Sequence, residues 1–216
     1  MKPAIIAGAA FLAFALLHSI TVSRRFKSAV ASIAGGERMR AYYRLAFTAI
    51  SILTASAAYY VYSLQPDTFL YRPGWYILWP AHIVQFLGVW LIVAAMRPFD
   101  TGSFTGVRQA SDYIRTGRTG GDIEGMKSGP LVTTGAYGLV RHPMYTAGIM
   151  MLVFEPNVTV NCLALRVLGT AYFVWGGFIE ERRFASGFGP EYGEYQQRVP
   201  MFNIVKGLAC WYRGHE

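Results

Sequence analysis

Residues 131–148 read LVTTGAYGLVRHPMYTAG, and residues 180–200, one long apolar region later, read EERRFASGFGPEYGEYQQRVP. Both stretches place charged and aromatic residues directly beside apolar runs. A membrane tolerates such charges only where they line a site or reach the interface with water. The two stretches therefore predict where the chemistry of this chain takes place.

The apolar runs around these stretches predict membrane helices. Of the 216 residues, 53% are hydrophobic, and a helix needs roughly 20 mostly apolar residues to cross a bilayer. Three runs have this length: residues 3–22, 45–64 and 75–96. A fourth region, residues 144–179, is too long for one span and is interrupted at 155–157 by Glu-Pro-Asn, a turn signal because proline cannot continue a helix. The sequence thus predicts an all-α integral membrane protein with five transmembrane helices, the last two forming a helical hairpin.

Basic residues cluster at the ends of these runs. The first loop contains many of them: Arg24, Arg25, Lys27, Arg38, Arg40 and Arg44. The loop at 65–74 carries only Arg72 beside Asp67, whereas residues 97–141 and the tail from Arg182 onward are again basic. The positive-inside rule then places the first loop, the third loop and the carboxyl terminus in the cytoplasm, with the amino terminus outside. We expect a bacterial inner membrane, and the net charge of +8 reflects this topology and not nucleic-acid binding.

Neither a signal peptide nor a metal site is predicted. A cleaved signal peptide is the alternative for residues 3–22, but the basic cluster follows that run and no small-residue cleavage pattern comes after it. Cys162 and Cys210 lack metal or redox spacing. Residues 101–129 are rich in glycine, threonine and charge, which predicts a cytoplasmic loop that serves either as a lid or as a flexible linker.

Several motifs resemble a known superfamily. They comprise Gly135, Tyr137, the RHPxY run of Arg141, His142, Pro143 and Tyr145, the pair Glu180 and Glu181, and the FGxxYxxYxxxVP pattern at 188–200. With them, the carboxyl-terminal part resembles the isoprenylcysteine carboxyl methyltransferase and phospholipid methyltransferase superfamily. The amino-terminal half is similar to bacterial methanethiol S-methyltransferases and the related NnrU membrane proteins. This similarity rests on Leu17, His18, Ser19, Glu37, Arg38, Tyr43, Arg44, Phe99, Asp100, Arg108 and Gln109.

The resemblance implies S-adenosylmethionine as cofactor, bound in a pocket at the cytoplasmic face. The predicted cofactor-binding residues are Pro130, Leu131, Val132, Tyr137, Arg141, His142, Tyr145, Glu180 and Glu181. A sulfonium cofactor carries a cation, an ammonium and a carboxylate, so its site needs an acid, a cationic or N–H donor, and aromatic or apolar walls. Each residue taken singly has a plainer interpretation as an interfacial anchor, a belt aromatic or a solvated helix end.

The acceptor is predicted to be a small or lipophilic thiol. Prenylcysteine enzymes of the superfamily carry an arginine about one turn before the paired glutamates, where this chain has Gly176 and Gly177. A thiol must become a thiolate, and Asp100 is the predicted catalytic residue for that step. The alternative is that Asp100 caps a helix or pairs with Arg97 or Arg108.

Other polar residues inside the apolar runs have packing interpretations. His18, His82 and Gln85 are expected to form hydrogen bonds within the helix bundle. Arg166 lies in an apolar run, where a charge is costly, so it is expected to reach the interface or to meet Glu155.

We therefore predict a single integral-membrane methyltransferase domain over residues 1–216. It consists of a three-helix part at 1–100 and a cofactor-binding part at 101–216. Its partners would be the acceptor and membrane lipid, without nucleic acid, and the sequence leaves the oligomeric state open. Three alternatives remain: methylation of a prenylcysteine carboxylate or phospholipid amine, a noncatalytic NnrU-like membrane factor, and reduction of a sterol by a nicotinamide cofactor.

Overall fold

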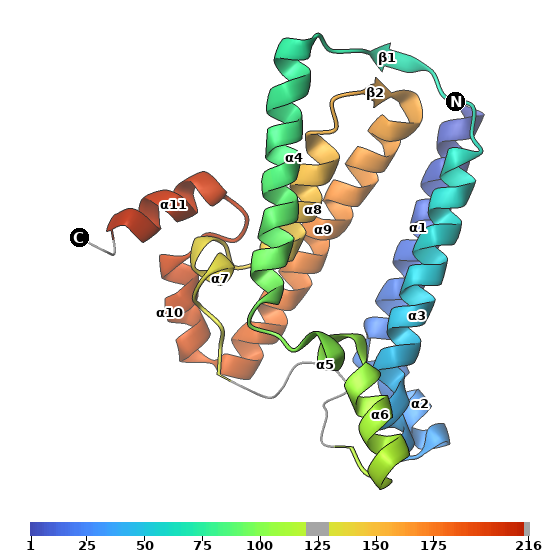
Figure 1. The fold of residues 1–216 in the computed structure, drawn as a ribbon, viewed down its shortest axis with the longest axis vertical. Coiled ribbons are helices and arrows are strands. Elements are labelled where there is room, and N and C mark those ends of the chain that lie inside the picture. The colour runs from blue at the N-terminus through green and yellow to red at the C-terminus, as the bar shows by residue number, and fades with distance from the viewer. Residues whose placement is uncertain (120–129, 214–216) are drawn as a thin grey trace. The chain divides into compact units, whose positions relative to one another are not determined.

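The computed structural model describes residues 1–119 and 130–213, and this part of the chain is mostly helical (Figure 1). Its contacts divide the chain into two compact units. One contains Met1–Pro66 and Phe99–Pro130, and the other contains Asp67–Pro98 and Leu131–Glu216. The units differ from the predicted division at residue 100, because the third long helix packs with the carboxyl-terminal helices. The prediction of a single domain is not tested by this division.

The first unit is built on two long helices that pack side by side. Its helices are α1 (Lys2–Val22), α2 (Arg24–Ala34), α3 (Gly36–Ser63), α5 (Thr101–Thr105) and α6 (Val107–Thr116). Between α1 and α3, His18 Nδ1 lies 3.1 Å from Ser51 Oγ, and the His18 ring lies 5.0 Å from the Phe47 ring. His18 thus has the packing contacts expected of a lone histidine in a membrane helix.

The segment predicted as a loop begins with two helices. Asp100 caps α5, the short turn at Gly106 connects α5 to α6, and α6 buries Gln109. At Gly106 a Cβ atom would lie 2.2 Å from the backbone nitrogen of Leu45, so glycine lets this turn approach α3. The loop prediction was therefore wrong for residues 101–116. Of the glycines that suggest a lid, Gly117 ends α6 in the left-handed conformation, whereas those at 120, 121 and 125 lie outside the described residues.

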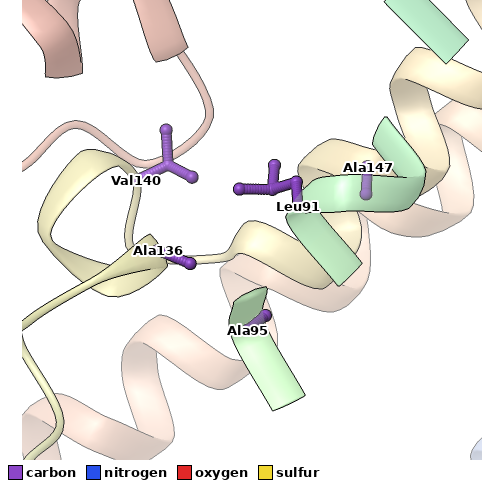
Figure 2. Packing of buried hydrophobic residues seen from close by; sticks show 5 residues of the cluster. All are labelled: Leu91, Ala95, Ala136, Val140 and Ala147. Atoms are coloured by element: carbon purple, nitrogen blue, oxygen red, sulfur yellow. The ribbon is translucent and has the colours of Figure 1, made fainter. Parts of the chain in front are cut away.

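The second unit contains the remaining elements. They are β1 (Phe69–Tyr71), α4 (Trp75–Met96), α7 (Ala136–Leu139), α8 (Pro143–Val153), β2 (Val158–Thr159), α9 (Val160–Phe188), α10 (Pro190–Arg198) and α11 (Ile204–Arg213). The strands form a small antiparallel sheet, which the sequence did not predict, with Phe69 opposite Thr159. Small side chains let α4, α7 and α8 approach closely around the cluster drawn in Figure 2: Leu91, Ala95, Ala136, Val140 and Ala147.

Within residues 1–119 and 130–213, four helices are long and apolar enough to cross a membrane: α1, α3, α4 and α9. The fifth predicted span is not confirmed. It corresponds to α8, whose 11 residues extend only about 16 Å, against a hydrocarbon core of about 30 Å. Helices α8 and α9 pack antiparallel, since Gly148 adjoins Phe173 while Gly169 adjoins Leu152.

Polar side chains from the neighbouring helices satisfy carbonyl groups in the last turn of α8 and in the turn that follows it. Gln85 Nε2 donates to the Met151 carbonyl at 3.2 Å. The Arg166 guanidinium donates to the carbonyl of Glu155 and to that of Asn157, the latter at 3.5 Å. Backbone groups at membrane depth need such partners. Gln85 and Arg166 thus have structural contacts, and Arg166 meets Glu155 through its backbone.

Candidate functional site

The connector between α7 and α8 holds the RHP motif against the segment after α10. The backbone N–H of Arg141 donates to the carbonyl of Pro200 at 3.0 Å, and that of His142 donates to Met201 at 3.3 Å. Pro143 begins α8, a position that suits its fixed φ and missing N–H. His142 lies outside the helical region of the backbone (φ −123°, ψ 68°), consistent with the bias of a residue before proline against helix. The two sequence stretches quoted above therefore meet in one place.

Glu181 is the centre of this meeting point. Its buried carboxylate accepts hydrogen bonds from Arg141 Nε at 2.9 Å and from Arg141 Nη2 at 2.8 Å. On the other sides Tyr192 Oη donates at 2.7 Å and Gln196 Nε2 at 2.6 Å. Arg141 also donates to the carbonyl groups of Gln196 and Val199. Glu181 and Arg141 thus join α9 to α10 and to the α7–α8 connector.

His142 lies between the two glutamates. Its Nε2 atom is 2.6 Å from Glu181 Oε1 and its Nδ1 atom is 3.4 Å from Glu180 Oε2. The rings of Tyr145 and Phe184 stack on the imidazole, with centroids 5.7 and 6.3 Å away. Burial alone would lower the pKa of His142, but the hydrogen bonds to Glu180 and Glu181, and their charges, raise it above its ordinary value. The arrangement therefore favours the imidazolium form.

Glu180 is the more open of the two acids. Its side chain is 34% exposed, against 10% for Glu181. Its carboxylate faces His142, and after burial its charge is the next cause that raises the pKa of the Tyr145 hydroxyl. Burial, and after it the charge of Glu180, raises the pKa of Tyr137 to about 12. Tyr137, His142 and Tyr145, all predicted from sequence motifs, thus surround one carboxylate.

The other predicted site residues lie in different settings. Leu131 and Val132 are half-buried in the second unit, while Pro130 is exposed and belongs to the first. Asp100 also belongs to the first unit. Its carboxylate accepts from the backbone N–H of Ser103 at 2.6 Å and pairs with Arg108 Nη2 at 2.9 Å. These are the contacts of the alternative in which Asp100 has a structural role, and its catalytic role stays a prediction.

Sequence reasoning missed the part that α10 plays in this site. The FGxxYxxYxxxVP pattern contains Tyr192 without giving it a role, and Gln196 occupies one of its unspecified positions. The two residues are four apart, so they share one face of a helix, and both contact Glu181. Two polar residues four apart, in a segment that follows the paired acids, are the sequence signal that could have predicted these contacts. The Tyr195 hydroxyl, on the same helix, donates to the Tyr137 carbonyl at 2.6 Å.

Comparison with curated proteins finds relatives of two kinds. A methanethiol S-methyltransferase of Pseudomonas deceptionensis is 33% identical over 115 residues, which cover 53% of this chain and 41% of the relative. Methanethiol S-methyltransferase 1 of Bradyrhizobium diazoefficiens is 38% identical over 65 residues, which cover 30% of this chain and 23% of the relative. The cobalt-zinc-cadmium resistance protein CzcN of Cupriavidus metallidurans is 32% identical over 96 residues, covering 41% of this chain and 44% of the relative.

These matches span less than half the length of each relative. No family model and no solved structure matches the chain. The predicted similarity to proteins named methanethiol S-methyltransferase is nevertheless confirmed over part of the chain.

Proposed function

We propose that this chain is a membrane-embedded methyltransferase that uses S-adenosylmethionine and methylates a small or lipophilic thiol. The observation that carries the proposal is that the one-third-exposed carboxylate of Glu180 acts electrostatically on Tyr137, His142 and Tyr145 together. The similarity to proteins named methanethiol S-methyltransferase supports it. The inferred membership in the isoprenylcysteine methyltransferase-like superfamily agrees with both.

The residues around Glu180 suit the chemical groups of this cofactor. Glu180 offers an acceptor for an ammonium or for ribose hydroxyls, and its exposure leaves room for a ligand. The rings of Tyr137 and Tyr145 offer aromatic surface to a cation or to adenine. Leu131 and Val132 are further candidates for the apolar wall.

Arg141 and Glu181 have a different part in the proposal from the one that the sequence suggested. Their charged groups already bond to each other and to α10. We assign them to holding His142 and α10 in place, and not to direct contact with the cofactor. We also assign His142 a positioning role without direct contact to the cofactor, because both of its ring nitrogens face glutamates.

Bound S-adenosylmethionine would supply a methyl group that is already activated, so the protein mainly needs to position the acceptor. Gly176 supports a small acceptor. A Cβ atom there would lie 3.6 Å from the Tyr145 ring, so the missing side chain leaves this face of the ring uncovered. The thiol must also lose its proton, a step for which Asp100 remains the predicted residue.

Two measurements on the purified full chain test this function. Calorimetry in detergent should detect binding of S-adenosylmethionine to the wild type, with much weaker binding to Glu180→Gln. Mass spectrometry should then detect methyl transfer to methanethiol in preference to farnesylcysteine or phosphatidylethanolamine. Wild-type affinity in the Glu180 variant would overturn the site, and preferential methylation of farnesylcysteine or of the lipid would overturn the acceptor. A protein that neither binds the cofactor nor transfers methyl groups would favour the noncatalytic alternative.

A further inference from the structure

Helix α2 is tied directly to two membrane spans. Ser23 ends α1 and also caps α2, its hydroxyl accepting from the backbone N–H of Phe26 at 3.3 Å. Gly35 ends α2 and precedes α3. Because one residue at each end connects α2 to the spans, the helix cannot move away from this end of the α1–α3 pair.

The lengths of the two spans give the depth of α2 in a bilayer. Helix α1 has 21 residues and α3 has 28, which correspond to about 31 and 42 Å. A hydrocarbon core is about 30 Å thick, and about 40–45 Å with its headgroup layers. The amino terminus of α1 and the end of α3 lie at the same end of the unit (Figure 1). The charged start of α3 therefore extends into the headgroup layer, and α2 lies within that layer.

The exposed side of α2 has an apolar edge. Lys27, Val30 and Ala31 are half-buried, with Lys27 Nζ 5.9 Å from the centre of the Tyr43 ring on α3. On another side Phe26 is 38% exposed and Ile33 is 88% exposed. With Ala29 between them, Phe26 and Ile33 have the spacing of one helical face. Within the described part of the first unit, this face remains open.

Beside that apolar edge the surface is basic. Arg24 and Arg25 are exposed on α2, which contains no acidic residue, and Arg38 is exposed at the start of α3. Nearby Glu37 pairs with Arg40. Among the described residues, no carboxylate pairs with Arg24, Arg25 or Arg38. A helix with an apolar edge and an arginine-rich face, held at headgroup level, matches the requirements for binding an anionic membrane surface.

We propose that α2 and the start of α3 form a binding surface for anionic phospholipids. Phe26, Ala29 and Ile33 insert between the lipids near the acyl-chain boundary. Arg24, Arg25 and Arg38 bind headgroup phosphates of the same leaflet. The charge complementarity and the depth of α2 both favour lipid over a protein partner.

A fluorophore on α2 tests this surface in the full chain. The background carries Cys162→Ser and Cys210→Ser, and a solvent-sensitive dye is attached to Ile33→Cys or, as a matched control on the polar face, to Ser32→Cys. The protein is placed in phosphatidylcholine bilayer discs that contain nitroxide-labelled phosphatidylglycerol or nitroxide-labelled phosphatidylcholine. We expect an apolar environment and strong quenching at position 33, and a more aqueous environment at position 32. Quenching by phosphatidylglycerol should exceed that by phosphatidylcholine several-fold.

Charge variants identify the source of this preference. Each basic residue near an anionic surface contributes on the order of fivefold in affinity, so Arg24→Gln, Arg25→Gln and Arg38→Gln together should bring the two lipids close to equal quenching. The control variant removes the same charge elsewhere, through Arg115→Gln, Arg118→Gln and Lys206→Gln, and should keep the preference. Equal quenching by both lipids in the wild type, or equal loss in both triple variants, would overturn the proposal. A water-exposed signal at position 33 would show that this face is open, and would also overturn the proposal. An apolar signal that depends on protein concentration and not on the lipid would indicate contact with a second copy, with the same consequence.

Discussion

Two neighbouring glutamates on α9 have opposite surroundings. Glu181 is buried and accepts hydrogen bonds from Arg141, Tyr192 and Gln196. Glu180 is about one-third exposed and faces His142 and Tyr145. Adjacent residues point about 100° apart around a helix, so a pair of acids can serve two separate faces. The comparison teaches that one acid is committed to holding the scaffold together while its neighbour keeps the exposed surface on which the proposed ligand site rests.

The largest effect is expected from Glu181→Ala. The substitution leaves Arg141 and His142 without their buried partner, and breaking a buried ion pair in this way costs about 3–5 kcal/mol. Denaturant unfolding in detergent should show a loss of this size in the free energy of unfolding. Glu180→Ala is the matched control and should lose less than about 1 kcal/mol, as for an exposed pair. Equal losses in the two variants would contradict the separate roles of the acids.

The next effect concerns ligand binding and rests on the proposed function. Glu180→Gln keeps the size of the side chain but removes its charge, and hydrogen bonds to charged groups contribute about 1.5–3 kcal/mol. Calorimetry should therefore show about 10- to 100-fold weaker binding of S-adenosylmethionine, with a loss of less than about 1 kcal/mol in the free energy of unfolding. Glu191→Gln, at an exposed acid of α10, should bind like the wild type. If both variants bind equally well, Glu180 is not a ligand of the cofactor.

The paired glycines one turn earlier extend the comparison to packing. A Cβ atom at Gly177 would lie 2.7 Å from the Phe202 ring, whereas one at Gly176 would meet the Tyr145 ring at 3.6 Å. Overpacking of this kind typically costs about 1–3 kcal/mol, so Gly177→Ala should lower the thermal midpoint. Gly176→Ala should leave it unchanged or raise it, since alanine favours the helix. A greater loss at position 176 than at 177 would show that the packing of α9 differs from the structure.

Composition and apolar run length were enough to predict the helical class and the long helices α1, α3, α4 and α9. The apolar run from residue 144 to the interruption at 155–157 also matches α8, whose 11 residues are too few for the span predicted there. Run length could not predict that Gln85 on α4 donates to the Met151 carbonyl in the last turn of α8. A contact between residues so far apart in sequence has no periodic signal.

The sequence could predict which residues come together in the candidate site but not what each of them contacts. The motifs brought together Tyr137, His142, Tyr145 and the acid pair, because these residues occur at spacings that resemble a known superfamily. Burial decides which of the two carboxylates is fully hydrogen-bonded and which stays exposed. Burial at the end of α9 in turn depends on how α10 packs against it. Sequence spacing alone treats Glu180 and Glu181 alike. For Asp100, the structure adds Ser103 and Arg108 as partners, which favours its structural interpretation.

The smallest expected effect is a pH dependence of stability that arises from His142. Both acids hold the pKa of His142 above its ordinary value of about 6.5, against the opposing effect of burial. A group whose pKa is higher in the folded than in the unfolded protein contributes its full stabilisation below the unfolded pKa and loses it as the pH rises through the folded pKa. The thermal midpoint in detergent should therefore decline as the pH rises above about 6.5.

Two variants test whether this decline arises from the His142 imidazole between the two glutamates. His142→Gln should remove the part of the decline that depends on the imidazolium, so its curve over this pH range should be flatter than that of the wild type. Glu180→Gln removes one of the two charges that stabilise the imidazolium but leaves Glu181 in place, so the decline should be smaller and should end at a lower pH. An unchanged slope in His142→Gln would mean that other groups cause the pH dependence. An unchanged curve in Glu180→Gln would mean that Glu181 alone maintains the charge on His142, which would leave Glu180 entirely to the ligand.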